Sequence, residues 1–180
     1  MTKEVVLKDG RTMTIRRAEP HDAEEIISFA EIIAAETDNL TFGPGEFGIQ
    51  ADDERAFIKD TNSKDNSAFF VGVVDGAISG MAIFLGGKRP RIRHAGDLSI
   101  SVRRSCWGVG AGEALMKELL AWAKATGIVT KVNLDVRTDN EGAIRLYRKL
   151  GFTDCGLDRR AMNVGGRYFD CLLMELFIDG

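Results

Sequence analysis

Three glycines at alternate positions form the first group of residues that could do chemistry. They follow the apolar run 98–102 and precede apolar residues spaced as one broad helical face between 115 and 123. The free N–H groups of a helix's first turn attract anions, and glycine lets an anion come close to the backbone. The pattern therefore predicts a phosphate-binding turn. Its residues are Trp107, Gly108, Val109, Gly110, Ala111 and Gly112.

Two other phosphate-binding loops do not fit this stretch. A P-loop ends in Gly-Lys-Ser/Thr, and no such triplet follows Gly112. A Rossmann turn needs Gly-x-Gly-x-x-Gly/Ala. The sixth residue is Glu113 when counted from Gly108 and Leu115 when counted from Gly110, so both registers fail.

A second group combines an amide and a phenol on one predicted helix. Asn140 and Tyr147 are two helical turns apart, so both side chains lie on one face of a helix over 141–150. Gly151 is placed to end that helix. A neutral phenol, with a pKa of about 10, can donate a proton to a leaving group.

Together the two groups resemble the signatures of the GCN5-related N-acetyltransferase (GNAT) family. The family's pyrophosphate loop, Gln/Arg-x-x-Gly-x-Gly/Ala, fits at Gly110 and Gly112 but departs at Trp107, where Trp-Gly-x-Gly is a familiar variant. The second signature, Asn-x-x-Ala-x-x-Leu-Tyr-x-x-x-Gly-Phe, is present at every position from Asn140 to Phe152. The resemblance covers about residues 13–177, and in particular the chain resembles bacterial small-molecule and amino-acid N-acetyltransferases.

The resemblance implies acetyl-CoA as co-substrate and no metal. The pantetheine arm would pair with free backbone groups of a splayed strand and with Asn140, and the pyrophosphate would bind amides of the glycine turn. The cofactor-binding residues expected in this way are Ile100, Ser101, Val102, Trp107, Gly108, Val109, Gly110, Ala111, Gly112, Glu113, Asn140, Ala143 and Tyr147.

Acetyl transfer needs an amine free of its proton and a proton for the departing thiolate, while positioning supplies much of the rate. By the resemblance, Tyr147 would face the sulfur and act as the acid. Candidates for the base are Asp135 beside the cofactor, Asp97 on the other splayed strand, and Glu36 in an irregular stretch. A chain of water molecules is the alternative base.

The sequence does not identify the acceptor amine. Residues 36–53 form an irregular stretch that is either a lid over the substrate or a surface loop, and we expect Glu36, Phe42 and His94 to contact the substrate. Acidic side chains favour polyamines and basic ones favour amino acids; the family branch slightly favours amino acids. The acidic set is Glu36, Asp38, Glu46, Asp52 and Asp53, and the basic set is Arg89, Arg91, Arg93 and His94.

Two other functions stay open at this point. The same fold could acetylate the N-terminus of a protein, or the chain could be an acetyl-CoA sensor without turnover. The intact Asn140 motif and Tyr147 argue against the sensor.

The expected fold is α/β: a GNAT fold with a mixed, mostly antiparallel, twisted sheet of about seven strands, splayed central parallel strands and about four helices. One N-acetyltransferase domain is expected over residues 1–180. The pair Asp9-Gly10 predicts a type I′ hairpin turn, and the pair Asp75-Gly76 predicts another hairpin turn. Strands are expected at 5–7, 13–15, 68–74, 77–85, 98–102, 129–136, 159–164 and 168–177, and helices at 20–34, 52–60, 115–123 and 141–150.

Composition narrows the partners. A net charge of −3 gives no reason to expect nucleic acid. No apolar run has membrane-spanning length and no signal-peptide core is present, so we expect a cytoplasmic protein without a membrane partner. Three cysteines without metal-ligand spacing indicate free thiols in a reducing compartment. The expected partner is a small-molecule amine, and a homodimer is a further candidate.

Overall fold

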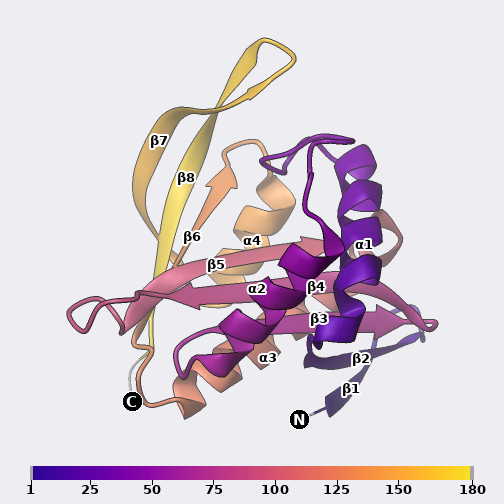
Figure 1. The fold of residues 1–180 in the computed structure, drawn as a ribbon. Coiled ribbons are helices and arrows are strands. Elements are labelled where there is room, and N and C mark those ends of the chain that lie inside the picture. The colour runs from indigo at the N-terminus through magenta and orange to yellow at the C-terminus, as the bar shows by residue number, and fades with distance from the viewer. Residues whose placement is uncertain (1, 179–180) are drawn as a thin grey trace.

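An eight-stranded mixed sheet forms the centre of the protein (Figure 1). The computed structural model describes residues 2–178. The strand order is β1-β2-β3-β4-β5-β6-β8-β7, and each neighbouring pair is antiparallel except β5 and β6. The strands are β1 (Thr2–Val6), β2 (Thr12–Arg17), β3 (Ala68–Val74), β4 (Ala77–Gly86), β5 (Ala95–Val102), β6 (Lys131–Arg137), β7 (Thr153–Val164) and β8 (Arg167–Phe177). The expected mixed, mostly antiparallel sheet is confirmed, with eight strands where about seven were expected.

Helices cover both faces of this sheet. They are α1 (Ala23–Glu36), α2 (Ala51–Ser63), α3 (Ala111–Ala125) and α4 (Glu141–Lys149), with short 3-10 turns at Pro20–Asp22 and Arg104–Cys106. The pair α1 and α2 packs on one face around Phe29, Ile58 and Phe69, and the pair α3 and α4 packs on the other around Leu115 and Ile144. Each fully buried large apolar side chain contributes about 1.5–3 kcal/mol. None of the described helices is long and apolar enough to cross a membrane.

Both predicted hairpins form, and one of the two predicted turns is correct. Asp75 and Gly76 both have positive φ, 52° and 78°, and connect the paired residues Val74 and Ala77, as a type I′ turn requires. The type I′ turn at Asp9-Gly10 is wrong. Five residues, 7–11, join β1 to β2, and only Gly10 among them has positive φ. In this loop the Leu7 amide donates to the Arg11 carbonyl at 2.8 Å, and the Lys8 amide donates to the carbonyl of Val109 in the glycine turn at 3.0 Å.

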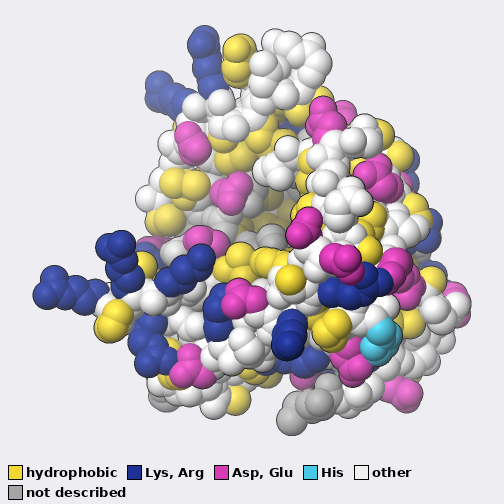
Figure 2. Space-filling model, viewed as in Figure 1, with side chains coloured by type: hydrophobic (Ala, Val, Ile, Leu, Met, Phe, Trp, Pro, Cys, Tyr) yellow, Lys and Arg dark blue, Asp and Glu magenta, His cyan; other side chains and the backbone are white. Residues whose placement is uncertain are grey.

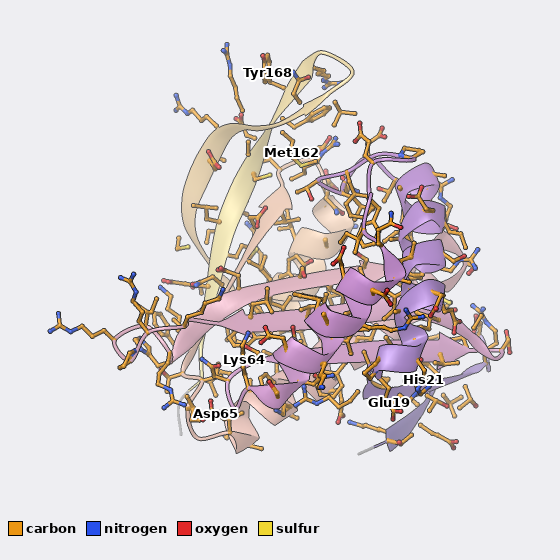
Figure 3. The ribbon with its side chains drawn as sticks, in the orientation of Figure 1. Glu19, His21, Lys64, Asp65, Met162 and Tyr168 are labelled. Carbon is orange, nitrogen blue, oxygen red and sulfur yellow. The ribbon has the colours of Figure 1, made fainter. Side chains whose placement is uncertain are left out.

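The last two strands form a ribbon that rises beyond the rest of the sheet. Figure 3 shows Met162 and Tyr168 near the tip of this ribbon. Strand β7 starts at Thr153, six residues before the expected start. Its register against β8 shifts twice, between Asp154 and Gly156 and again between Asp158 and Met162. These bulges break the alternation of side chains from which a strand is predicted.

Candidate active site

The two parallel strands in the middle of the sheet separate soon after they begin. Strands β5 and β6 are paired only from Ala95 to Asp97 and from Lys131 to Asn133. Beyond that point β5 stays paired with β4, and β6 stays paired with β8. Within residues 2–178, the inner edges of 98–102 and 134–137 therefore have no strand partner. The gap can accept an extended chain through backbone hydrogen bonds.

The register of β5 decides which of its backbone groups face the gap. The amide of Arg103 donates to Ser79 on β4, and Gly87 donates to Ala95. Antiparallel pairs alternate between bonded and non-bonded positions. Ser101, opposite Met81, therefore directs its backbone to β4, and the expected role for its backbone groups is corrected. The backbone groups that face the gap belong to Leu98, Ile100 and Val102.

Trp107 occupies part of this edge. Its indole Nε1 donates to the carbonyl of Val102 at 2.7 Å, so that carbonyl has a partner within the chain. The ring remains half exposed, and the guanidinium of Arg104 lies over it at 5.5 Å. The residue that departs from the family pattern thus fixes the turn to the end of β5.

The glycine turn has the conformation that its sequence predicts. Gly108 and Gly110 have φ of +73° and +96°, and a Cβ added at either would meet no atom within 4 Å. Among the described residues, the amides of 108–113 donate to no backbone or side-chain acceptor. These free donors at the start of α3, in open space, fit a phosphate group.

Charges beside the turn are arranged in a triad. Glu113, in the first turn of α3, lies 2.8 Å from the ammonium of Lys117 and 2.7 Å from that of Lys149 on α4. The hydrogen bonds from Lys117 and Lys149 lower the pKa of Glu113 to about 2. Glu113 therefore keeps its negative charge near the expected pyrophosphate position at all physiological pH values.

Asn140 caps the N-terminus of α4, and Tyr147 follows two helical turns later. The Asn140 side-chain oxygen accepts the amide of Ala143 at 3.3 Å. Its NH2 group donates to no acceptor in residues 2–178, so it is free for a ligand. Tyr147 is 7% exposed, and its ring packs 5.9 Å from that of Phe152. Burial, and secondly the charge of Asp135, raise the pKa of Tyr147 to about 12.

The carboxylates expected as bases lie on the sheet face that carries α1 and α2. Val132, Leu134 and Val136 pack in the core on the α3 side, so the alternate residues of β6, including Asp135, face the other way. Asp97 is also exposed, and the side-chain amide of Asn133 donates to it at 3.5 Å.

A pocket of about 480 Å³ lies where the splayed strands end. It is lined by Ala35, Glu36, Thr37, Asp38, Asn39, Arg104, Trp107, Arg137 and Asp139. The Glu36 carboxylate accepts the amide of Arg104 at 2.6 Å, and the Arg104 guanidinium donates to the Glu36 carbonyl. Within residues 2–178 Arg104 forms no ion pair, so its charge is available to a ligand. Glu36 was expected at the site, whereas Arg104 and Arg137 were not, because in the sequence both look like ordinary residues at the end of a strand.

Two of the expected substrate contacts lie elsewhere. His94 is exposed at the start of β5, where its carbonyl accepts the amides of Thr130 and Lys131 at the closed end of the gap. Arg89, Arg91 and Arg93 precede it in the turn between β4 and β5, whose basic side chains project at the left of Figure 2. These basic residues therefore lie apart from the pocket that contains Glu36. Phe42 packs on Phe47 at 5.0 Å and is not among the lining residues.

Solved structures share this fold. An acetyltransferase of the GNAT family from Streptococcus pneumoniae has a TM-score of 0.89 at 32% identity, over 93% of this chain and 99% of that chain. The structure of yncA, a putative acetyltransferase from Salmonella typhimurium with its cofactor acetyl-CoA, has a TM-score of 0.81 at 23% identity, over 93% and 95%. The second likeness shows the fold alone. These structures define the class, an α/β protein with the acetyltransferase fold.

The chain belongs to the acetyltransferase (GNAT) family, whose model matches residues 29–152. The L-amino acid N-acetyltransferase AaaT of Escherichia coli is 31% identical over 104 residues, 58% of this chain and 64% of that protein. The N-alpha-acetyltransferase RimI of Mycobacterium tuberculosis is 44% identical over 68 residues, 38% and 40%. The chain thus spans less than two thirds of the length of either relative. The family resemblance found in the sequence is confirmed.

Proposed function

We propose that this protein transfers the acetyl group of acetyl-CoA to the primary amine of a small molecule that carries a carboxylate, with amino acids as the first class to test. The observation that carries the acceptor class is the pocket at the open end of the β5–β6 gap, with the unpaired cation of Arg104 in its wall. A carboxylate there would gain a charge-assisted hydrogen bond.

Binding of acetyl-CoA is assigned to groups that have no partner within the described chain. The carbonyl of Leu98 and the gap-facing backbone of Ile100 would hold the pantetheine arm together with the Asn140 amide. The amides of 108–113 would hold the pyrophosphate. Acetyl-CoA supplies an activated acyl carbon and a thiolate leaving group.

The proposed chemistry is direct transfer. The free amine attacks the thioester carbonyl carbon, a C–N bond forms, and the C–S bond breaks. Tyr147 donates a hydrogen bond to the departing sulfur. The proton lost by the amine goes to Asp135 or Asp97, which lie on the sheet face that carries α1 and α2, or to water. Positioning of the amine by the pocket supplies the rest of the rate.

Thiol release in the presence of an acceptor panel tests this proposal. Free amino acids should be acetylated faster than their methyl esters, their amides and polyamines. Arg104→Gln should raise the KM for an amino acid about 10- to 100-fold, the range expected for one hydrogen bond to a charged group. Arg91→Gln, in the basic turn at the far end of β5, is the matched control and should leave KM unchanged.

The relatives also favour a second acceptor class, because one of them is an N-alpha-acetyltransferase. Peptides with a free N-terminal amine therefore belong in the same panel. Faster turnover of such peptides than of any free amino acid would replace the first proposal by the second. Binding of acetyl-CoA without thiol release for any amine would indicate a sensor.

A further inference from the structure

Arg137 is a buried cation that the acetyl-transfer chemistry does not use. It ends β6 and is 8% exposed. Its Nε and Nη2 donate to the two carboxylate oxygens of Asp139 at 2.9 and 2.6 Å, and its Nη1 donates to the carbonyl of Asp38 at 2.7 Å. The guanidinium also lies 3.6 Å from the ring centre of Phe169 on β8.

These contacts join three parts of the chain that are far apart in sequence. Asp38 lies just after α1, Asp139 lies in the turn before α4, and Phe169 belongs to the β7–β8 ribbon. A planar guanidinium can form a bidentate pair, donate to a third acceptor and stack on a ring at the same time, and an ammonium cannot. Arginine is therefore the side chain that this junction requires.

The segment 37–50 between α1 and α2 contains no helix or strand, and it supplies the pocket residues Thr37, Asp38 and Asn39. The segment's other tertiary hydrogen bond is made with α1, the helix that precedes it in sequence: the Gly45 amide donates to the carboxylate of Glu31. Among the described residues, the bond from Arg137 to Asp38 is the hydrogen bond that ties this segment to the sheet, while Leu40 makes an apolar contact with the cluster under α1 and α2.

We propose that Arg137 is a positioning residue that holds the segment 37–50 in place as the wall of the acceptor pocket. Its side chain then controls the affinity for the acceptor and leaves the affinity for acetyl-CoA unchanged. The kinetic part of this inference rests on the proposed function. The backbone bond from the Asn140 amide to the Arg137 carbonyl, at 2.9 Å, survives any substitution of the side chain.

Hydrogen exchange of the free protein tests the inference without any substrate. Arg137→Lys keeps the charge and loses the bidentate pair and the third bond, so amides in 37–50 should exchange at least about 5-fold faster, while those of α3 stay unchanged. Arg17→Lys is the matched control. Arg17 stacks on Phe70 at 4.7 Å and donates to Asn62 near the C-terminal end of α2, whereas the segment 37–50 precedes the N-terminal end of that helix. Unchanged exchange in 37–50 of the Arg137 variant would overturn the inference.

Steady-state kinetics separates positioning from general damage. Arg137→Lys should raise the acceptor KM about 10-fold and change the dissociation constant of acetyl-CoA less than 2-fold. Asp139→Asn should also raise the acceptor KM. The double variant should lose less acceptor affinity than the sum of the two single losses, because both residues act through the same Arg137–Asp139 pair. Equal losses for acceptor and acetyl-CoA would contradict the positioning role. If the wild type accepts no amine, the proposed function fails while the exchange experiment still decides the role of Arg137.

Discussion

At the scale of single residues, burial defines what the Tyr147 phenol can do. A pKa of about 12 keeps the phenol neutral throughout the physiological range. A thiol leaving group has a pKa of about 8.5, so complete proton transfer from this phenol to the thiolate is uphill. In the proposed reaction Tyr147 would therefore act mainly by donating a hydrogen bond as negative charge develops on sulfur.

Substitution of this phenol tests that role. Tyr147→Phe removes one hydroxyl and keeps the ring against Phe152, so turnover should fall about 10- to 1,000-fold, at the low end because the phenol is a weak acid. The KM for acetyl-CoA should change little, since its other contacts are with backbone groups and Asn140. Tyr168→Phe, in the other and exposed tyrosine, is the control. Full activity of the Tyr147 variant would make Tyr147 a core residue and water the acid.

Glu113 gives a prediction with a defined pH window. Its pKa is about 2 in the folded protein against an ordinary value near 4.5, so its ion pairs stabilise the fold above pH 4.5, and this stability is lost as the pH falls from about 4.5 to about 2. Partly exposed pairs contribute little, so Glu113→Gln should lower the unfolding free energy by about 1 kcal/mol or less at pH 7. Denaturation at pH 7 and pH 2 tests this, and an equal difference at both pH values would contradict it.

At the scale of elements, the turn into α3 combines a backbone requirement with a ligand requirement. Gly110 has a positive φ at the start of the helix, and a Cβ added there would meet no atom within 4 Å, so a ligand can approach its backbone. Gly127, two residues beyond the other end of α3, also has a positive φ, +63°, and open space. The two glycines therefore share a conformational constraint, and only the first lies at the expected pyrophosphate position.

A pair of valine variants separates these two requirements. Gly110→Val and Gly127→Val should each lose about 1–2 kcal/mol of stability, the cost of a left-handed conformation for a residue with a Cβ. Gly110→Val should also weaken acetyl-CoA binding at least about 10-fold, because its side chain fills the approach to the amides. Calorimetric titration of the folded variants measures this. If the Gly110 and Gly127 variants bound acetyl-CoA with equal affinity, the phosphate-binding role of the turn would be wrong.

At the scale of the whole molecule, acetyl-CoA should bridge three elements, β5, α3 and α4. A ligand that contacts β5, α3 and α4 of the folded state alone stabilises that state by mass action. At 100 times its dissociation constant it should add about 2.7 kcal/mol, or roughly 5–10 °C in melting temperature for a chain of this size. Thermal unfolding with acetyl-CoA, NAD and ATP tests this, and NAD and ATP should do much less. Equal stabilisation by NAD would favour a dinucleotide site.

The local sequence pattern was sufficient to predict those features whose residues all lie within one helix or one turn. The helix with Asn140 and Tyr147, the turn at Asp75-Gly76 and the turn into α3 all involve residues within two helical turns of one another. The type I′ turn at Asp9-Gly10 was predicted wrongly, and the longer loop found there makes a tertiary contact, the hydrogen bond from the Lys8 amide to the Val109 carbonyl, that no local turn preference encodes. The start of β7 was missed because bulges hide its alternation.

The sequence by itself determined the family, the glycine turn and the face of α4 that carries Asn140 and Tyr147, because helical periodicity and backbone conformation act over short distances. The tertiary structure alone decided which backbone groups of β5 face the gap, since that depends on the register with β4. It also placed His94 at the closed end of the gap and brought Arg137 to Asp38, 99 positions apart in the chain. Such contacts arise from the pairing order of the sheet, which no local pattern encodes.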